Sequence, residues 1–107
     1  MKKLALPALA AVAASAALAP SAPAATKTVR VDDDVFRPGS LSIRVGDTVR
    51  WRWVGDNPHN VTVTSGRQKF RSSTKSSGTF SKRIRRGGRY RIVCTVHPGM
   101  DMTLRAR

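Results

Sequence analysis

The residue types that could carry chemistry are few, and most of them lie close together near the C-terminus. Within seven residues the chain places a thiol at Cys94, an imidazole at His97 and a thioether at Met100. The other histidine of the chain, His59, lies about thirty-five residues before the cysteine. Two imidazoles, one thiolate and a weak axial thioether form the donor set of a mononuclear blue-copper site. The pattern therefore predicts one copper ion held by these four side chains.

This mixture of donors suits a metal that carries one electron at a time. Thiolate and thioether sulfur favour Cu(I), imidazole binds both oxidation states, and a fixed trigonal arrangement limits rearrangement when an electron moves. The chain holds only 2 His and 1 Cys, which is too few ligands for a dinuclear or trinuclear metal enzyme. A single cysteine also excludes an internal disulfide. We expect a one-copper protein that is not an enzyme by itself.

Two methionines follow His97 closely enough to supply the axial sulfur. Met100 gives the spacing His-x-x-Met, whereas Met102 leaves four residues between the two ligands. If Met100 is the ligand, about six residues remain for a last strand with Met102, Leu104 and Ala106 on its inward face. If Met102 is the ligand, only a stub of a strand remains. The sequence therefore predicts Met100 as the axial ligand and places Met102 in the core.

The segments that must position these side chains show the period-two alternation of β-strands. From Thr26 onward, apolar residues recur at every second position, with turn residues about every ten positions. The sets expected to face inward are Val29 and Val31; Leu41, Ile43 and Val45; Val49, Trp51 and Trp53; Val61 and Val63; Ile84; Tyr90 and Ile92; and Met102 and Leu104. The pattern predicts an all-β domain, a sandwich or barrel of seven or eight short strands.

Residues 65–81 depart from this alternation. They are rich in Ser, Lys and Gly, and their two aromatic residues are Phe70 and Phe80. We expect a longer connection that these two rings anchor to the core.

The alternation also predicts where the candidate ligands point. His59 shares the parity of Val61 and Val63, at the start of its strand, and Cys94 shares the parity of Ile92, at the end of its strand. Side chains of one parity lie on one face of a strand. Both ligands are therefore expected to point into the same interior, where the loop with His97 and Met100 can close over a metal.

Three stretches of the chain resemble a known family of copper proteins. They are Phe36-x-Pro38-x-x-Leu41-x-Ile43-x-x-Gly46-Asp47-Thr48-Val49-x-Trp51, then Pro58-His59-Asn60-Val61, and then Gly88-x-Tyr90-x-x-x-Cys94-x-x-His97-Pro98-Gly99-Met100. Over residues 29–106 the chain is similar to cupredoxins of the plastocyanin, amicyanin and halocyanin group.

This resemblance implies a Greek-key β-sandwich with copper at one end, bound through a ring nitrogen of His59 and one of His97. It also implies that Asn60 ties the strand of His59 to the loop of Cys94. The chain departs from the family at Met102, where relatives usually have glycine.

The first residues have the order of a secretory signal peptide. A basic head, Met1 to Lys3, precedes an apolar run from Leu4 to Leu18 and a stretch of Ala, Pro and Ser. An Ala-x-Ala site at 22–24 predicts cleavage before Ala25, with a second candidate site at 17–19, and an uncleaved membrane anchor is the alternative. We expect a signal peptide over 1–24, a copper-binding domain over 25–107, and export to the periplasm or the cell exterior.

The charge of the chain is strongly positive. There are 20 Lys and Arg against 6 acidic residues, a formal net charge of +14. Removal of Lys2 and Lys3 with a signal peptide leaves 18 basic residues and a net charge of +12. The densest run, residues 82–91, is expected to form a solvated basic hairpin that steers an acidic partner or an anionic surface, or else to reflect a compositional excess of arginine. No recognition helix or exposed aromatic series points to nucleic acid.

These observations predict an exported, monomeric blue copper protein that shuttles electrons between redox partner proteins with acidic surfaces. His97, on the closing loop, is expected to be at least as exposed as His59 and to pass the electron. One alternative is a copper-delivery module, which would lack an intense visible band. The other is a basic binding domain that uses no copper, which metal analysis would reveal.

Overall fold

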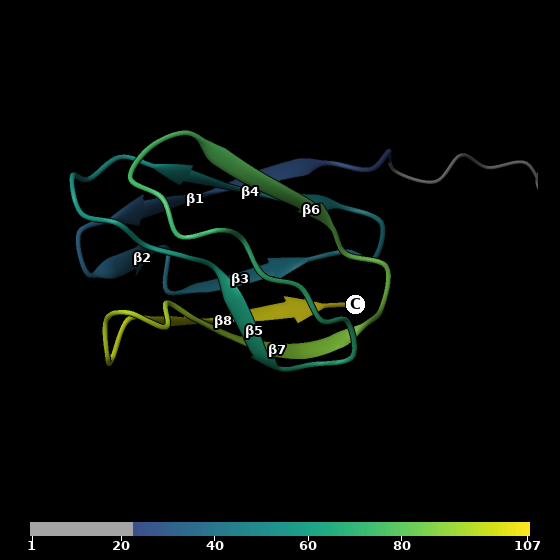
Figure 1. The fold of residues 1–107 in the computed structure, drawn as a ribbon. Coiled ribbons are helices and arrows are strands. Elements are labelled where there is room, and N and C mark those ends of the chain that lie inside the picture. Colours follow the sequence, from purple (N-terminus) through teal and green to yellow (C-terminus); the bar gives the residue numbers. More distant parts are fainter. Residues whose placement is uncertain (1–22) are drawn as a thin grey trace, which may run out of the picture.

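Within residues 23–107, eight strands form two four-stranded sheets that face each other across one core (Figure 1). The computed structural model describes residues 23–107, so most of the expected signal peptide lies outside the described residues. The strands are β1 (Thr26–Asp32), β2 (Val35–Arg37), β3 (Ser40–Ile43), β4 (Thr48–Trp53), β5 (Thr62–Ser65), β6 (Thr79–Arg83), β7 (Gly88–Val93) and β8 (Asp101–Ala106). Among residues 23–107, no helix is long and apolar enough to cross a membrane.

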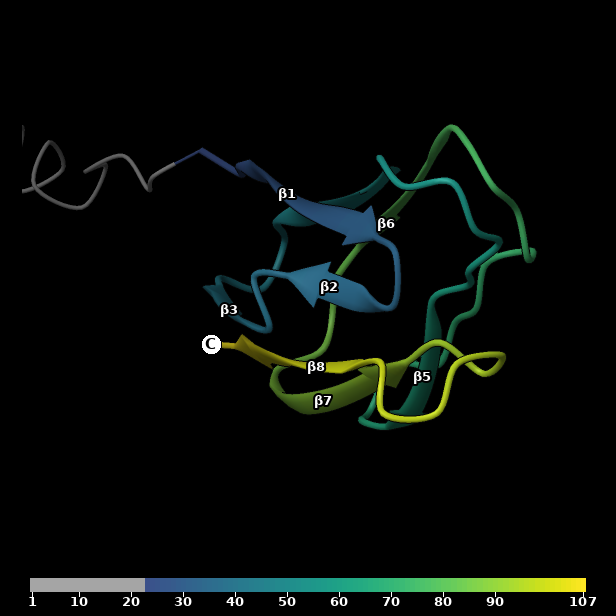
Figure 2. The ribbon, with the colours of Figure 1, turned by 90° about the vertical axis from the view of Figure 1, so that its left-hand side faces the viewer.

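The strand order fixes which loops meet at each end of the sandwich. One sheet has the order β2-β1-β4-β6 and the other the order β3-β8-β7-β5. The β1–β4 and β3–β8 pairs are parallel, and the remaining pairs are antiparallel. The turn after β1, the segment after β4 and the loop after β7 therefore gather at one end, which faces the viewer in Figure 2. The all-β sandwich expected from the sequence is confirmed.

The core consists of the residues that the alternation placed inward. Burial in β4 alternates strictly, with Val49, Trp51 and Trp53 inside and Arg50 and Arg52 outside. The other buried apolar residues from the predicted sets are Val29, Val31, Ile43, Val61, Val63, Ile84, Tyr90, Ile92, Met102 and Leu104.

The prediction of an inward-facing side chain is wrong at one position of these sets, Val45. Val45 is 44% exposed, because β3 ends at Ile43 and the chain then turns instead of continuing as a strand. The N–H of Val45 bonds to the carbonyl of Arg107 at 2.9 Å, so its backbone is satisfied in the turn. Leu41, in the same set, is only partly buried.

The basic run at 82–91 does not form the hairpin that the sequence predicts. β6 pairs with β4 in one sheet, whereas β7 pairs with β5 and β8 in the other. The intervening residues therefore cross between the two sheets, and Ile84 is buried on the way. Arg83, Arg85, Arg89 and Arg91 are exposed, as expected.

The irregular connection after β5 supports the edge of the second sheet. Phe70 and Phe80 pack against Trp51 with ring centroids 5.8 and 5.9 Å away, which confirms their role as anchors. Between them the chain runs beside the segment that leads into β5, and His59 and Lys75 exchange two backbone hydrogen bonds of 2.9 and 3.1 Å. The connection thereby fixes the backbone of one candidate ligand.

Asp47 holds the start of the domain against the turn after β3. Its carboxylate accepts the backbone N–H of Ala25 at 2.9 Å and that of Arg44 at 3.0 Å. These two bonds, that of Ala25 first, hold the pKa of Asp47 below its ordinary value of 3.8.

We expect Asp47→Asn to lower the free energy of unfolding at neutral pH and to matter less in acid. Because the pKa of Asp47 is lowered in the folded chain, its contribution is complete above about pH 3.8 and is lost as the pH falls through the lowered value. Urea unfolding at about pH 7 and pH 3 measures this, with Asp101→Asn as the control for loss of an exposed carboxylate. An equal destabilisation by Asp47→Asn at both pH values would contradict it.

Candidate metal centre

The candidate ligands come from two segments that the second sheet brings together. His59 lies just before β5, Cys94 follows the last residue of β7, and His97 and Met100 lie on the loop between β7 and β8. The inward parity expected for His59 and Cys94 is confirmed, because both are buried. The structure thus brings together three of the predicted side chains in one cluster.

Three donor atoms of this cluster form a nearly regular triangle. His59 Nδ1 lies 3.1 Å from His97 Nδ1, and Cys94 Sγ lies 3.5 Å from His97 Nδ1 and 3.9 Å from His59 Nδ1. A triangle with these sides has a point about 2 Å from all three atoms, which is close to the distances of roughly 2.0 to 2.3 Å that His and Cys ligands keep from zinc. A single ion of that size fits between them with little adjustment.

The protonation of the two rings also favours a cation at this point. His59 Nε2 lies 3.2 Å from Asp33 Oδ1, and His97 Nε2 lies 3.3 Å from Asp34 Oδ1. A carboxylate can only accept a hydrogen bond, so a neutral ring places its hydrogen at Nε2 and presents a lone pair at Nδ1. Two nitrogen lone pairs and a sulfur then face one another, an arrangement that a positive ion between them would stabilise.

The two histidines differ in their access to solvent. The His59 side chain is 0% exposed, whereas the His97 side chain is 28% exposed. His97 is therefore the more accessible of the two, as the sequence analysis expected. Its neighbours on the loop, Val96, Pro98 and Gly99, are exposed.

The loop after β7 is closed by its own backbone. The N–H of Cys94 donates to the carbonyl of Met100 at 2.9 Å, and the N–H of Met100 donates to the carbonyl of His97 at 3.1 Å. Met100 is buried and immediately precedes β8, whereas Met102 is buried within β8, opposite Ile92. β8 has six residues, Asp101–Ala106, with Met102, Leu104 and Ala106 buried.

Asn60 joins the segment of His59 to the loop of Cys94. Its backbone N–H points at Cys94 Sγ at 3.5 Å, and its amide oxygen accepts the N–H of Thr95 at 3.1 Å. Its amide nitrogen donates to the hydroxyls of Thr95 and Thr74 at 2.8 and 3.0 Å. Because Asn60 is buried, these bonds hold the thiol and the buried imidazole in a fixed relation. This is the link that the family resemblance implied.

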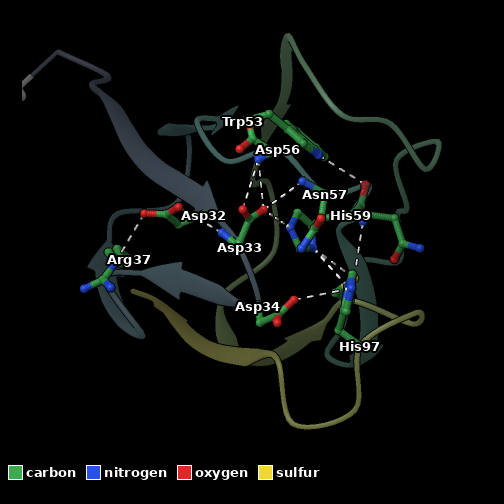
Figure 3. A network of polar contacts seen from close by, with 11 residues as sticks. Asp32, Asp33, Asp34, Arg37, Trp53, Asp56, Asn57, His59 and His97 are labelled. Carbon is green, nitrogen blue, oxygen red and sulfur yellow. Dashed lines mark hydrogen bonds and ion pairs between the residues drawn. The ribbon is translucent and has the colours of Figure 1, made fainter.

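Two carboxylates that lie behind the imidazoles were not predicted from the sequence. Asp33 and Asp34 form the turn between β1 and β2, about twenty-five residues before His59, and period-two patterning gives no information about a turn. The only signal was the run Asp32-Asp33-Asp34 in a chain with 6 acids. Figure 3 shows both carboxylates directed at the histidine rings.

Asp33 is itself held in place by the segment after β4. Its carboxylate accepts the backbone N–H of Asn57 at 2.8 Å and that of Asp56 at 3.0 and 3.1 Å. These bonds, that of Asn57 first, keep the pKa of Asp33 below its ordinary value. The carboxylate therefore stays ionised while it faces His59.

Comparison with known proteins agrees with this geometry. The family model for copper-binding proteins of the plastocyanin/azurin family matches residues 24–105. Among curated proteins, no relative is found by sequence.

Solved structures share the fold at low identity. A purple cupredoxin from Nitrosopumilus maritimus has 21% identity and a TM-score of 0.69, over 76% of this chain and 99% of its own. An oxidized mutant form of amicyanin has 24% identity and a TM-score of 0.68, over 77% of this chain and 82% of its own. A Cu-containing nitrite reductase from Thermus scotoductus SA-01 has 22% identity and a TM-score of 0.68. This chain matches 84% of its own length but only 24% of that enzyme's.

Proposed function

The chain belongs to the plastocyanin/azurin family of copper-binding proteins, and we propose that it is an exported carrier that moves single electrons between partner proteins. Family membership and the His-Cys-His cluster make it a blue copper protein with one copper ion. The observation that carries the electron-transfer role is the triangle of two Nδ1 atoms and one Sγ. A preformed site of this kind needs little rearrangement when the oxidation state changes.

We propose that His59 Nδ1, Cys94 Sγ, His97 Nδ1 and the thioether of Met100 would hold the copper ion. Bound copper supplies a one-electron couple at this position. The protein's part is to hold the donors still: Asn60 fixes the thiolate by its N–H, and the backbone bonds between Cys94 and Met100 close the loop. Burial of Cys94 keeps water away from the sulfur.

We propose that electrons enter and leave through the ring of His97. It is the one histidine of the cluster with exposed surface, and Val96, Pro98 and Gly99 around it carry no charge that would have to be desolvated on docking. His59 is enclosed and has no such route.

The partners are proposed to be redox proteins with acidic surfaces. The arginines of the outer sheet faces stand next to one another, with Arg30 opposite Arg37 and beside Arg52, and Arg89 opposite Arg105. Like charges in such registers repel, so an anionic surface that approaches them gains energy and is steered over long distances. Export through the expected signal peptide and a monomeric state belong to the same proposal.

The chain is also proposed not to be an enzyme by itself. Within residues 23–107 a single cluster of metal-binding side chains occurs, and copper reductases and oxidases require a second centre. Copper delivery is the competing role for the same cluster. It differs in that delivery needs no intense copper–thiolate band and no fast electron exchange.

The protein expressed from Ala25, purified and loaded with copper, tests the function. We expect one copper per chain, an intense visible band, and a reversible one-electron reduction. Electron transfer to an acidic partner should slow as salt rises, because at about 0.15 M salt the Debye length is only about 8 Å. Absence of copper would favour the metal-free domain, and a weak band without reversible reduction would favour delivery.

A further inference from the structure

Two consecutive carboxylates lie behind the two imidazoles, one for each ring. Asp33 and Asp34 occupy the two-residue turn between β1 and β2, and their Oδ1 atoms lie 3.2 Å from His59 Nε2 and 3.3 Å from His97 Nε2. The rings themselves are tilted by 48° with centroids 4.6 Å apart. One short turn therefore contacts both rings at their Nε2 atoms (Figure 3).

The choice of ion-pair partners in this chain is selective. The sequence has 20 Lys and Arg, yet within residues 23–107 the ion-pair contacts of Asp33 and Asp34 are with the histidines alone. Asp32, in the same run, pairs with Arg37, and Asp101 pairs with Arg91. In so basic a chain, a surface carboxylate would be expected to pair with Lys or Arg. Contact with an imidazole instead indicates a specific role for these two carboxylates.

The backbone of the segment after β4 holds the Asp33 carboxylate in its position next to His59. The N–H groups of Asp56 and Asn57 clamp its carboxylate. At Gly55 an added Cβ would lie 2.4 Å from Asp33 Oδ1 and 2.7 Å from the Asp33 backbone nitrogen. Only glycine at position 55 allows this approach, so Gly55 lets the segment after β4 pack directly against the turn after β1. At the other position of the turn, Asp34 has a φ of 62°, a conformation that Asp adopts more readily than most residues.

The effect on the rings follows from their chemistry. A carboxylate that accepts from Nε2–H fixes the tautomer, orients the ring and makes Nδ1 a better donor. A negative charge close to the site also stabilises the higher positive charge of Cu(II) more than that of Cu(I). This influence is strongest where water is excluded, so it should be larger for Asp33, against fully buried His59, than for Asp34, which is 63% exposed.

We propose that Asp33 and Asp34 are positioning residues that hold both imidazoles with Nδ1 toward copper and lower the reduction potential of the site. The inference rests on the proposed function for its redox part. Asp33 contributes the larger share, and the two contributions reinforce each other.

Charge-removing variants test the redox part. Asp33→Asn and Asp34→Asn keep an oxygen acceptor but remove the charge. Asp32→Asn is the matched control, because it makes the same change at the adjacent end of β1, where the carboxylate contacts Arg37 and no histidine. Its amide oxygen can still accept the N–H of Asp33. We expect Cu(II) affinity to fall about tenfold or more in Asp33→Asn and less in Asp34→Asn, with Cu(I) affinity less affected. A tenfold difference between the two losses raises the potential by about 59 mV. Potentials in Asp33→Asn and Asp34→Asn that move no more than in Asp32→Asn would overturn the proposal.

The positioning role can be tested in the metal-free protein, by measuring which nitrogen of each histidine ring carries the proton. By ¹⁵N NMR of the metal-free protein at about pH 8, we expect the His59 proton at Nε2 in the wild type and partly at Nδ1 in Asp33→Ala. Asp34→Ala, at an exposed position, provides the same comparison for His97 with little risk to folding. A wild-type proton at His59 Nδ1 would overturn the proposal. Wild-type protein that binds no copper would instead contradict the proposed function, and the NMR result would still decide the positioning role.

Discussion

Replacement of Cys94 by serine is expected to abolish the intense visible band of the copper-loaded protein. The band arises from charge transfer within a copper–thiolate bond, and Cys94 is the one cysteine in the chain. Its sulfur lies 3.5 and 3.9 Å from the two Nδ1 atoms, so no other group can take its place without moving the loop. A serine hydroxyl is a poor ligand for Cu(I), and copper retention should fall with the colour.

The absorption spectrum and the copper content of the purified Cys94→Ser variant provide the measurement. Circular dichroism of the metal-free forms controls for folding, since a sulfur-to-oxygen change at this buried position leaves the sheet contacts in place. Met102→Leu, a change in a buried sulfur side chain of the same sheet, should stay blue. A retained band in Cys94→Ser would remove the thiolate from the site and with it the type of centre proposed.

Much of the fold could be predicted from the sequence because burial and strand periodicity are tightly linked. The alternation of Val49, Trp51 and Trp53 with two arginines leaves only one face of β4 for the core. The same parity placed His59 and Cys94 inside, and the structure confirms both. Parity worked here because these residues lie on strands or at their ends, where side-chain direction follows from position.

Where the chain turns or changes sheet, the same reasoning had no basis. Val45 continues the parity of Ile43, yet it is exposed because the strand stops two residues earlier. The basic run at 82–91 resembles a hairpin, but its two strands pair with different neighbours in different sheets. Pairing partners depend on the whole topology and not on the local pattern.

The carboxylates behind the histidines show the same limit at the site. Asp33 meets His59 only because β1 and β4 run parallel, which brings the turn after β1 beside the segment after β4. The sequence contains both acids and also Gly55, which allows the close approach of Asp33. Their relation to the histidines is a tertiary property. Cys94, His97 and Met100 could be singled out because they lie within seven residues, and His59 because it is the other histidine of the chain and has inward parity.

The two methionines have different proposed roles, Met100 as a copper ligand and Met102 as a core residue. Their leucine variants should therefore behave differently. Met100→Leu is expected to raise the reduction potential and to change the visible spectrum, since an axial thioether tunes both. If Cu(II) affinity falls tenfold relative to Cu(I), the rise is about 59 mV. Met100, the ligand that we propose, lies on the closing loop, where its carbonyl accepts the N–H of Cys94 and its own N–H donates to the carbonyl of His97.

Met102→Leu should leave both properties nearly unchanged and alter stability by about 1 kcal/mol or less, because the swap nearly conserves volume. Met102 lies in β8 opposite Ile92, with Leu104 two residues further on the same buried face, so its side chain fills the core. Potentiometry and urea unfolding of the two variants, measured side by side, separate the roles. A potential that moves in Met102→Leu while Met100→Leu changes only stability would transfer the ligand role to Met102.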